Sequence, residues 1–191
     1  MCWRSLLHEI RMQKLSLARL DPRAGMPVMP PVGAAPGAIL AAEQRLGRPL
    51  PPSYRELLAQ HDGLPQLYQG AGLLGARSLA RGTYVELARL VIDEPRGEGA
   101  TAPALFPFGI DAAGETIFAW DCGRARADGE LEILVWINEI VERVESFPAF
   151  LELVREMLAA ELEDRAGASA PPPAPRRRGR LTEPSLRVAA A

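Results

Sequence analysis

The side chains that could carry out catalysis are few in this chain of 191 residues. The two cysteines and two histidines are Cys2, Cys122, His8 and His61. His61 and Asp62 are adjacent, but they stand directly before Gly63, where a helix is expected to end. A hydrolase needs a nucleophile, a base and an acid that orients the base, and the sequence does not indicate such a set. We therefore interpret His61 as a helix-terminal residue and expect no enzymatic activity; an enzyme that uses His61 is an alternative.

A glycine-rich segment is the second candidate for chemistry. Gly70, Gly72 and Gly75 match the G-x-G-x-x-G pattern of dinucleotide-binding loops. Such a loop binds a pyrophosphate only between a strand and the start of a helix, because the helix amides hold the phosphates. Here the glycines follow a predicted helix and a proline-containing turn, and no acidic ribose ligand follows on a second strand. We interpret the segment as a connection and predict no cofactor; an enzyme that uses Gly72 is the alternative.

Carboxylates and a tryptophan gather around one predicted hairpin. Structural zinc needs four Cys or His ligands at short spacings, which the chain lacks. Asp111, Glu115 and Asp121 could hold a hard cation, but a solvated turn is favoured and we predict no metal. Tryptophan is a common anchor at protein interfaces, and carboxylates attract basic partners. The sequence thus predicts a partner-binding surface of Asp111, Glu115, Trp120 and Asp121, with a core position as the alternative for Trp120.

The charge is unevenly distributed along the chain. The net charge is −2, yet residues 36–164 carry −10, while residues 1–35 carry +3 and residues 165–191 carry +5. An acidic body repels nucleic acid and speeds encounter with a basic protein, although solubility alone would also explain it. The arginine cluster at 176–180 has no interleaved aromatic residues, and we interpret it as a flexible solubilising tail, with contact to nucleic acid or anionic lipid as the alternative. We expect the folded domain to bind no nucleic acid and no membrane.

Length and composition indicate one soluble domain. Hydrophobic residues make up 48% of the chain, enough for a sizeable core, and no apolar run approaches the ~20 residues of a membrane span. Glu9, Arg11 and Lys14 interrupt the apolar stretch that a secretory signal would need, so we expect no signal peptide and a cytoplasmic location. We divide the chain into an N-terminal extension and Pro/Gly-rich linker, one folded domain and a disordered Ala/Pro/Arg tail: 1–35, 36–164 and 165–191.

Periodicity predicts an α+β fold, with helices packed on a mainly antiparallel or mixed sheet and with flexible termini. Helical spacing begins at Trp3 and recurs over 38–46, from Ser53 and after Ser146. Residues 84–92 fit either a helix or a strand, and we favour the helix. Gly47 is expected to end the second of these helices, and Ser53 with Glu56 to form a capping box. Strands are predicted over 105–110, 116–120 and 131–137. The remaining segments are predicted as a turn (111–114), turn-rich or loop regions (64–82, 95–103, 122–129) and a disordered tail (166–191).

The segment Ala41–Gly63, AAEQRLGRPLPPSYRELLAQHDG, resembles the SUKH superfamily, specifically its Smi/Knr type. The matching positions are Glu43, Leu46-Gly47, Leu50-Pro51, Tyr54, Leu57-Leu58 and Gly63. Later blocks follow in the expected order: FPFGIDAAGETIFAWD at 106–121, an apolar strand at 131–137, and Ser146-Phe147 before the last helix. The resemblance covers about residues 36–158.

This resemblance implies a non-enzymatic binding module. Bacterial proteins of this kind look like immunity proteins that bind and occlude toxins, often nucleases or deaminases, so the expected partner is a basic toxin domain. Similar fungal domains belong to cell-wall regulators. A regulatory or scaffold module with several weak partners is therefore the alternative function. The family supplies no catalytic residue to carry over.

Overall fold

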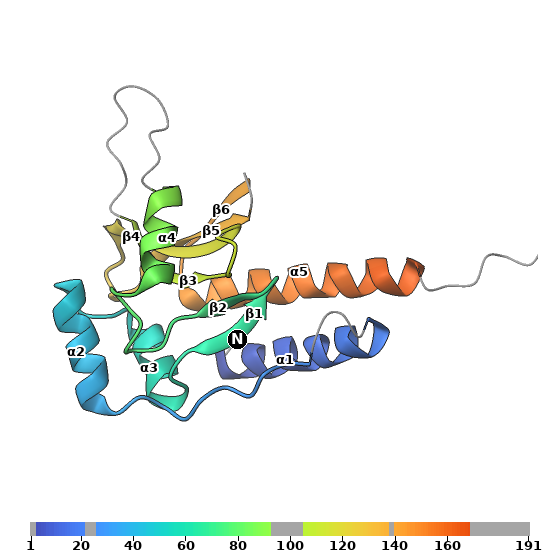
Figure 1. The fold of residues 1–191 in the computed structure, drawn as a ribbon, viewed down its shortest axis with the longest axis horizontal. Helices are drawn as coiled ribbons and strands as arrows, with labels where there is room; N and C mark the ends of the chain where they lie inside the picture. The colour runs from blue at the N-terminus through green and yellow to red at the C-terminus, as the bar shows by residue number, and fades with distance from the viewer. Residues whose placement is uncertain (1–2, 22–25, 93–104, 138–139, 169–191) are drawn as a thin grey trace, which may run out of the picture.

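The computed structural model describes residues 3–21, 26–92, 105–137 and 140–168 (Figure 1). Within these residues the chain forms α1 (Trp3–Leu20), α2 (Pro36–Leu46), α3 (Pro52–Gln60), β1 (Leu64–Tyr68), β2 (Ala71–Leu73), α4 (Thr83–Ile92), β3 (Leu105–Ile110), β4 (Thr116–Ala125), β5 (Leu131–Ile137), β6 (Ile140–Val144) and α5 (Phe147–Ala168). The predicted α+β class is confirmed.

The six strands form one antiparallel sheet in the order β1-β2-β3-β4-β5-β6. Each strand pairs with its neighbour in sequence, which is the simplest topology for strands in a meander. In the central hairpin, Leu105 lies opposite Asp121 and Ile110 lies opposite Ile117. The two ends of this hairpin are therefore well separated, and β1 and β6 are the edge strands.

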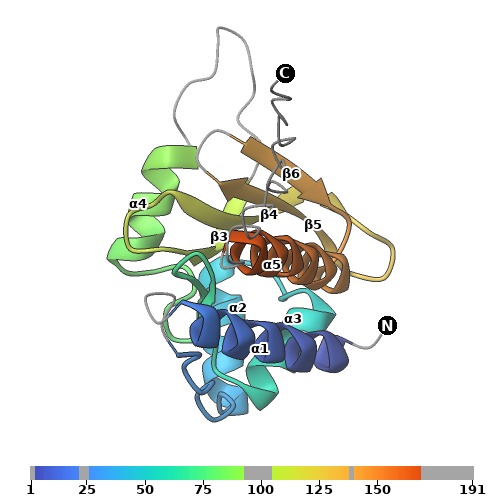
Figure 2. The same ribbon diagram turned by 90° about the vertical axis from the view of Figure 1, so that its right-hand side faces the viewer.

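The helices cover the two faces of the sheet unequally (Figure 2). The main core joins side chains of α1, α2, α3 and α5 to one face of the sheet, whereas α4 packs on the other face in a small cluster. Successive side chains of β4 alternate between these faces. Phe118 and Trp120 enter the main core, while Ile117 and Ala119 contact α4.

Tyr54 of α3 lies at the centre of the main core and is fully buried. Its ring makes edge-to-face contacts with Phe108, Trp120 and Phe147, at centroid distances of 5.3, 4.8 and 5.5 Å. Its hydroxyl donates a hydrogen bond to the Leu74 carbonyl at 2.7 Å, which satisfies the buried polar atom. Burial raises the pKa of this phenol well above its ordinary value.

The predicted N-terminal helix is confirmed, and it lies beside α5 (Figure 1). Its buried residues Trp3, Leu6, Ile10 and Leu17 belong to the main core. Arg155 of α5 pairs with Glu9 of α1 at 3.4 Å, and Arg165 of α5 pairs with Asp21, which directly follows α1. Because the second pair lies later in the chain on both sides, α1 and α5 run parallel.

The predicted helix over 38–46 is confirmed, as are the helix over 84–92, the three central strands and the last helix. Gly47 ends α2 in the left-handed conformation, with a φ of 67°. At the start of α5 the Ser146 hydroxyl accepts a hydrogen bond from the Ala149 amide at 3.4 Å. Within the described residues, no helix is long and apolar enough to span a membrane.

The predicted capping box of Ser53 and Glu56 is wrong. Pro52 begins α3, so Ser53 lies inside the first turn and not at the cap. Its amide and hydroxyl instead donate to the two carboxylate oxygens of Glu130, at 2.8 and 2.7 Å. The carboxylate from the β4–β5 connection thus supplies the acceptor for the helix start, where negative charge is favoured.

The turn-rich region at 64–82 contains two strands that were not predicted. β1 has no alternating apolar pattern, because Pro65 and Gln66 are both exposed and Gln66 has a φ of +53°. A Cβ at Gly72 of β2 would lie 2.9 Å from the Leu64 carbonyl oxygen. The three glycines therefore belong to a close-packed hairpin and the loop that follows it, not to a helix start.

The C-terminal part of the chain differs from the prediction in three places. β4 continues to Ala125 through the start of the expected loop at 122–129, β6 was not predicted, and α5 reaches Ala168. Residues 166–168 of the expected disordered tail are therefore helical. The expected loop at 95–103 and the tail from residue 169 lie outside the described residues.

Candidate partner-binding surface

The carboxylates predicted to bind a partner lie at opposite ends of the β3–β4 hairpin. Asp111 and Glu115 flank the turn, whereas Asp121 lies opposite Leu105 at the far end. The Asp111 carboxylate accepts a hydrogen bond from the Thr116 amide at 3.1 Å and is almost buried. Glu115 is exposed. The hairpin register therefore does not bring the three carboxylates into one patch.

Asp121 belongs to an ion-pair cluster across three strands. Arg143 of β6 donates to the Asp121 carboxylate at 2.7 Å and to Glu132 of β5 at 3.1 Å. Arg124 lies 3.8 Å from Asp121 and 3.5 Å from Glu132. The hydrogen bonds to Asp121 and Glu132 raise the pKa of Arg143, and the bond to Asp121 has the larger effect. Two carboxylates and two guanidinium groups neutralise one another, so Asp121 contributes little long-range attraction for a basic partner.

Trp120 lies in the core and not on a surface. It is 2% exposed, and its ring stacks on Phe108 at a centroid distance of 4.4 Å. Asp121, the next residue, points to the opposite face because side chains alternate along a strand. Trp120 therefore occupies a core position, which the sequence analysis gave as the alternative to a surface position. The partner-binding role of the three carboxylates stays a prediction.

The outer face of α5 carries carboxylates that sequence reasoning missed. At 100° per residue, Glu152, Glu156 and Glu163 lie within an arc of about 40°. Glu156 and Glu163 are exposed, and Glu152 is half-buried. Glu156 lies 3.6 Å from Arg155, and no other described residue forms an ion pair with any of the three carboxylates. We call these residues the α5 carboxylate stripe; their spacing in the sequence was the available signal.

A groove of about 240 Å³ lies where one side of α5 meets the sheet. It is lined by Tyr68, Val135, Ile137, Glu142, Leu153 and Met157. Glu142, the acidic lining residue, is exposed. Burial raises the pKa of the Tyr68 phenol, and the carboxylate of Glu161 acts in the same direction. An apolar groove therefore adjoins the helix that carries the α5 carboxylate stripe.

The residues considered for catalysis have structural roles. His61 is the C-terminal cap of α3, and its amide donates to the Leu57 carbonyl at 2.7 Å. The Asp62 carboxylate accepts from the Ala76 amide at 2.6 Å, which ties the end of α3 to the loop after β2. Burial raises the pKa of the half-buried Cys122 thiol, so its reactive thiolate is disfavoured. Among the described residues, no three His, Cys, Asp or Glu side chains gather to hold a metal.

Comparison with known protein families gives a match to the SMI1/KNR4 family (SUKH-1) over residues 33–153. A comparison with curated proteins finds no match. The family match extends from the segment before α2 into α5, so α1 and residues 154–168 of α5 lie outside it. It covers well over half of the chain and contains the whole six-stranded sheet. The chain therefore belongs to the SMI1/KNR4 family (SUKH-1).

Proposed function

We propose that this protein is a non-enzymatic binding module, specifically a bacterial immunity protein that neutralises a cognate toxin by binding and covering it. Membership of the SMI1/KNR4 family (SUKH-1) carries the proposal, because it is consistent with a protein-interaction or immunity module. An immunity protein meets its toxin inside the cell, so we place its action in the cytoplasm.

The charge of the body supports a basic partner. Residues 36–164 carry a net charge of −10, and basic domains that act on nucleic acid, such as nucleases or deaminases, complement that sign. We propose the α5 carboxylate stripe as the contact, because exposed carboxylates with few ion-pair partners attract cations most effectively. Covering a basic substrate-binding surface would deny the toxin its substrate without any chemical step.

The hairpin remains a second possible location for the contact. Of the carboxylates first predicted there, Glu115 is exposed. Asp111 is nearly buried and accepts a hydrogen bond within its turn, and Asp121 is paired with two arginines. Glu115→Lys therefore tests the hairpin without disturbing a buried partner. The triple variant E152K/E156K/E163K tests the α5 carboxylate stripe in the same way, and E86K changes an exposed carboxylate on α4 as a control.

The test begins with affinity capture of the tagged full chain from its native cells at low salt. A stoichiometric basic protein, released by high salt and toxic when expressed alone, supports the proposal if co-expression restores growth. The stripe variant should then fail to protect, while E86K protects fully. Protection by the stripe variant together with failure of E115K would move the contact to the hairpin. Several substoichiometric partners with no toxicity would instead support the regulatory module and contradict the immunity function.

A further inference from the structure

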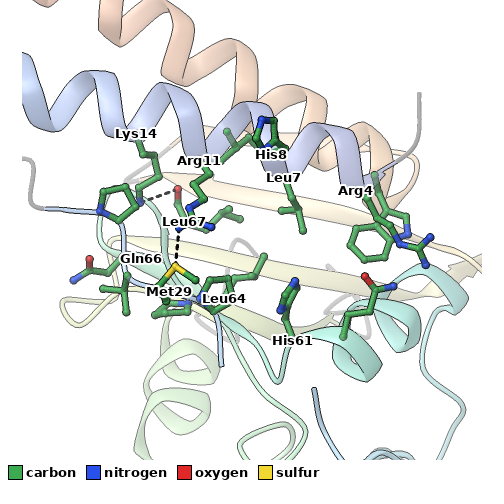
Figure 3. A pocket seen from close by; sticks show the side chains of 17 residues that line it. Arg4, Leu7, His8, Arg11, Lys14, Met29, His61, Leu64, Gln66 and Leu67 are labelled. Carbon is green, nitrogen blue, oxygen red and sulfur yellow. Dashed lines mark hydrogen bonds between the residues drawn. The ribbon is translucent and has the colours of Figure 1, made fainter. Parts of the chain in front are cut away.

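A cavity lies between α1 and β1, and its charge is opposite to that of the body (Figure 3). It has a volume of about 310 Å³ and is bounded by α1, the segment at 27–30, the end of α3 and β1. We call it the α1–β1 cleft. Because α1 lies outside the family match, this chain builds the cleft by adding its own helix to the family domain.

One face of α1 supplies a row of basic side chains to the cleft. Arg4, His8, Arg11 and Lys14 line it, and His61 faces them from the end of α3 (Figure 3). Both histidines and the single lysine of the chain are thus collected in one place. None of the described residues that line the cleft is acidic. The cleft is therefore a local positive site on a protein whose central body is negative.

These basic groups have few acidic partners of their own. The guanidinium of Arg4 lies 3.7 Å from exposed Glu56, while that of Arg11 contacts the sulfur of Met29. The Lys14 ammonium donates to the Leu67 carbonyl of β1 at 3.3 Å. Burial lowers the pKa of Lys14, although the carboxylate of Glu161 opposes this effect. A ligand that supplied carboxylates would therefore satisfy charges that the chain itself leaves mostly uncompensated.

Between the basic groups the cleft is apolar. Leu7 of α1 faces Leu64 and Leu67 of β1 across it (Figure 3), and the exposed side chains of Val28 and Met29 complete the apolar lining. Sites that combine apolar walls with a few placed polar groups bind specific ligands and not bulk ions. β1 is also an edge strand, which leaves one row of backbone groups without a strand partner.

We propose that the α1–β1 cleft binds an extended segment of a partner protein in which apolar side chains are interspersed among carboxylates. Arg4 and Lys14 are ten residues apart, about 15 Å along the helix, which suits several carboxylates in a row better than one small anion. Nucleic acid fits less well. Base stacking needs an exposed aromatic ring. The aromatic residue that lines the cleft is Trp3, but it is 7% exposed, and its indole N–H donates a hydrogen bond to the Glu56 carboxylate.

The α1–β1 cleft is a second binding surface, and its positive charge is opposite to that of the α5 carboxylate stripe. It does not depend on the identity of a toxin. Loss of binding at the cleft would leave the test of the α5 carboxylate stripe unchanged, so the two proposals fail separately.

The experiment uses the full chain and a labelled hexapeptide probe, Glu-Leu-Glu-Glu-Leu-Glu, with binding followed by fluorescence anisotropy at low salt. The variant R11Q/K14Q removes two charges from the cleft. The control R19Q/R77Q removes two charges from exposed arginines that do not line it. We expect the dissociation constant to rise about tenfold in the cleft variant and to change little in the control. Circular dichroism melts verify that both variants fold.

Amide chemical shifts of the 15N-labelled chain give an independent location for the peptide. Shifts concentrated in residues 3–14, 27–30 and 60–67 support the proposal. It is overturned if the peptide does not bind at millimolar concentration, or if R19Q/R77Q weakens binding as much as R11Q/K14Q. It is also overturned in favour of nucleic acid if an oligothymidylate of equal charge binds the cleft as tightly as the peptide.

Discussion

The parallel helices α1 and α5 present surfaces of opposite charge. α1 turns Arg4, Arg11 and Lys14 into the α1–β1 cleft, whereas α5 turns Glu152 and Glu156 outward. Where the helices meet, the pairs Glu9–Arg155 and Asp21–Arg165 balance the charges. A net charge of −2 therefore conceals a basic concave site and an acidic convex one. The comparison shows that the sign of a surface depends on which helix face is exposed, not on the charge of the whole chain.

The largest effect is expected from removing the packing of α1, because the basic surface depends on the position of this helix. Leu6 is fully buried in the main core, and Leu6→Ala should lower the free energy of unfolding by about 2–5 kcal/mol through lost burial and a cavity. Urea denaturation measures this change. Met12→Ala, at an exposed position of the same helix, should change it by less than about 0.5 kcal/mol. Equal stability of L6A and wild type would mean that α1 is not part of the folded core.

A second prediction separates carboxylates that hold the fold from those that are free. Asp121→Ala removes the buried one of the two carboxylates that Arg143 and Arg124 share, leaves them Glu132, and should lower the free energy of unfolding by about 1–3 kcal/mol. Solvent around the half-exposed guanidinium groups keeps the effect moderate. Substituting Glu152 by Gln on the α5 carboxylate stripe should have a much smaller effect in the same thermal or urea melts. If E152Q were the more destabilising change, this assignment of roles would be reversed.

Two peptide probes should distinguish the basic and acidic surfaces. Charge removal in the cleft by R11Q/K14Q should weaken binding of Glu-Leu-Glu-Glu-Leu-Glu by about tenfold and leave a Lys-Leu-Lys-Lys-Leu-Lys peptide unaffected. The variant E152Q/E156Q/E163Q should do the opposite, with a loss of about threefold because its carboxylates are more open to solvent. Fluorescence anisotropy in both variants provides the measurement. Identical responses of the two variants to both peptides would indicate unspecific charge effects.

The smallest effect concerns pH. Because burial lowers the pKa of Lys14, this residue loses its charge at a lower pH than an exposed lysine, while arginines stay charged. Binding of the acidic peptide to wild type should therefore weaken at alkaline pH, below the range in which an exposed lysine loses its charge. In Lys14→Arg the affinity should stay constant at those pH values. A matching decline in both proteins would show that Lys14 does not set the alkaline response.

Elements with strong local signals were predictable. The helical spacing before Gly47 and the apolar runs of β3 and β5 each led to an element that the structure contains. In contrast, β1 carries exposed Pro65 and Gln66 and has no period of two. Its strand conformation depends on pairing with β2, which a local pattern does not contain.

The candidate sites were less predictable than the elements. Asp111, Glu115 and Asp121 are acidic and close in the sequence, which suggested one acidic patch. The register of β3 and β4 places Asp121 at the opposite end of the hairpin from the other two, and Arg143 of β6 neutralises its charge. The α5 carboxylate stripe has a regular spacing that the sequence already contained. The cleft has no such signal, because α1 and β1 are more than forty residues apart in the chain.

The family and most of the helices and strands follow from local sequence patterns, because apolar periodicity and glycine positions act over a few residues. The sequence also determined the segregation of charge into a negative body and positive ends. In contrast, the burial of Trp120, the capping of α3 by Glu130 and the hydrogen bond from Lys14 to β1 arise from the folded arrangement of the chain. The reason is physical: these contacts join residues far apart in the chain, and only packing of the core sets their positions.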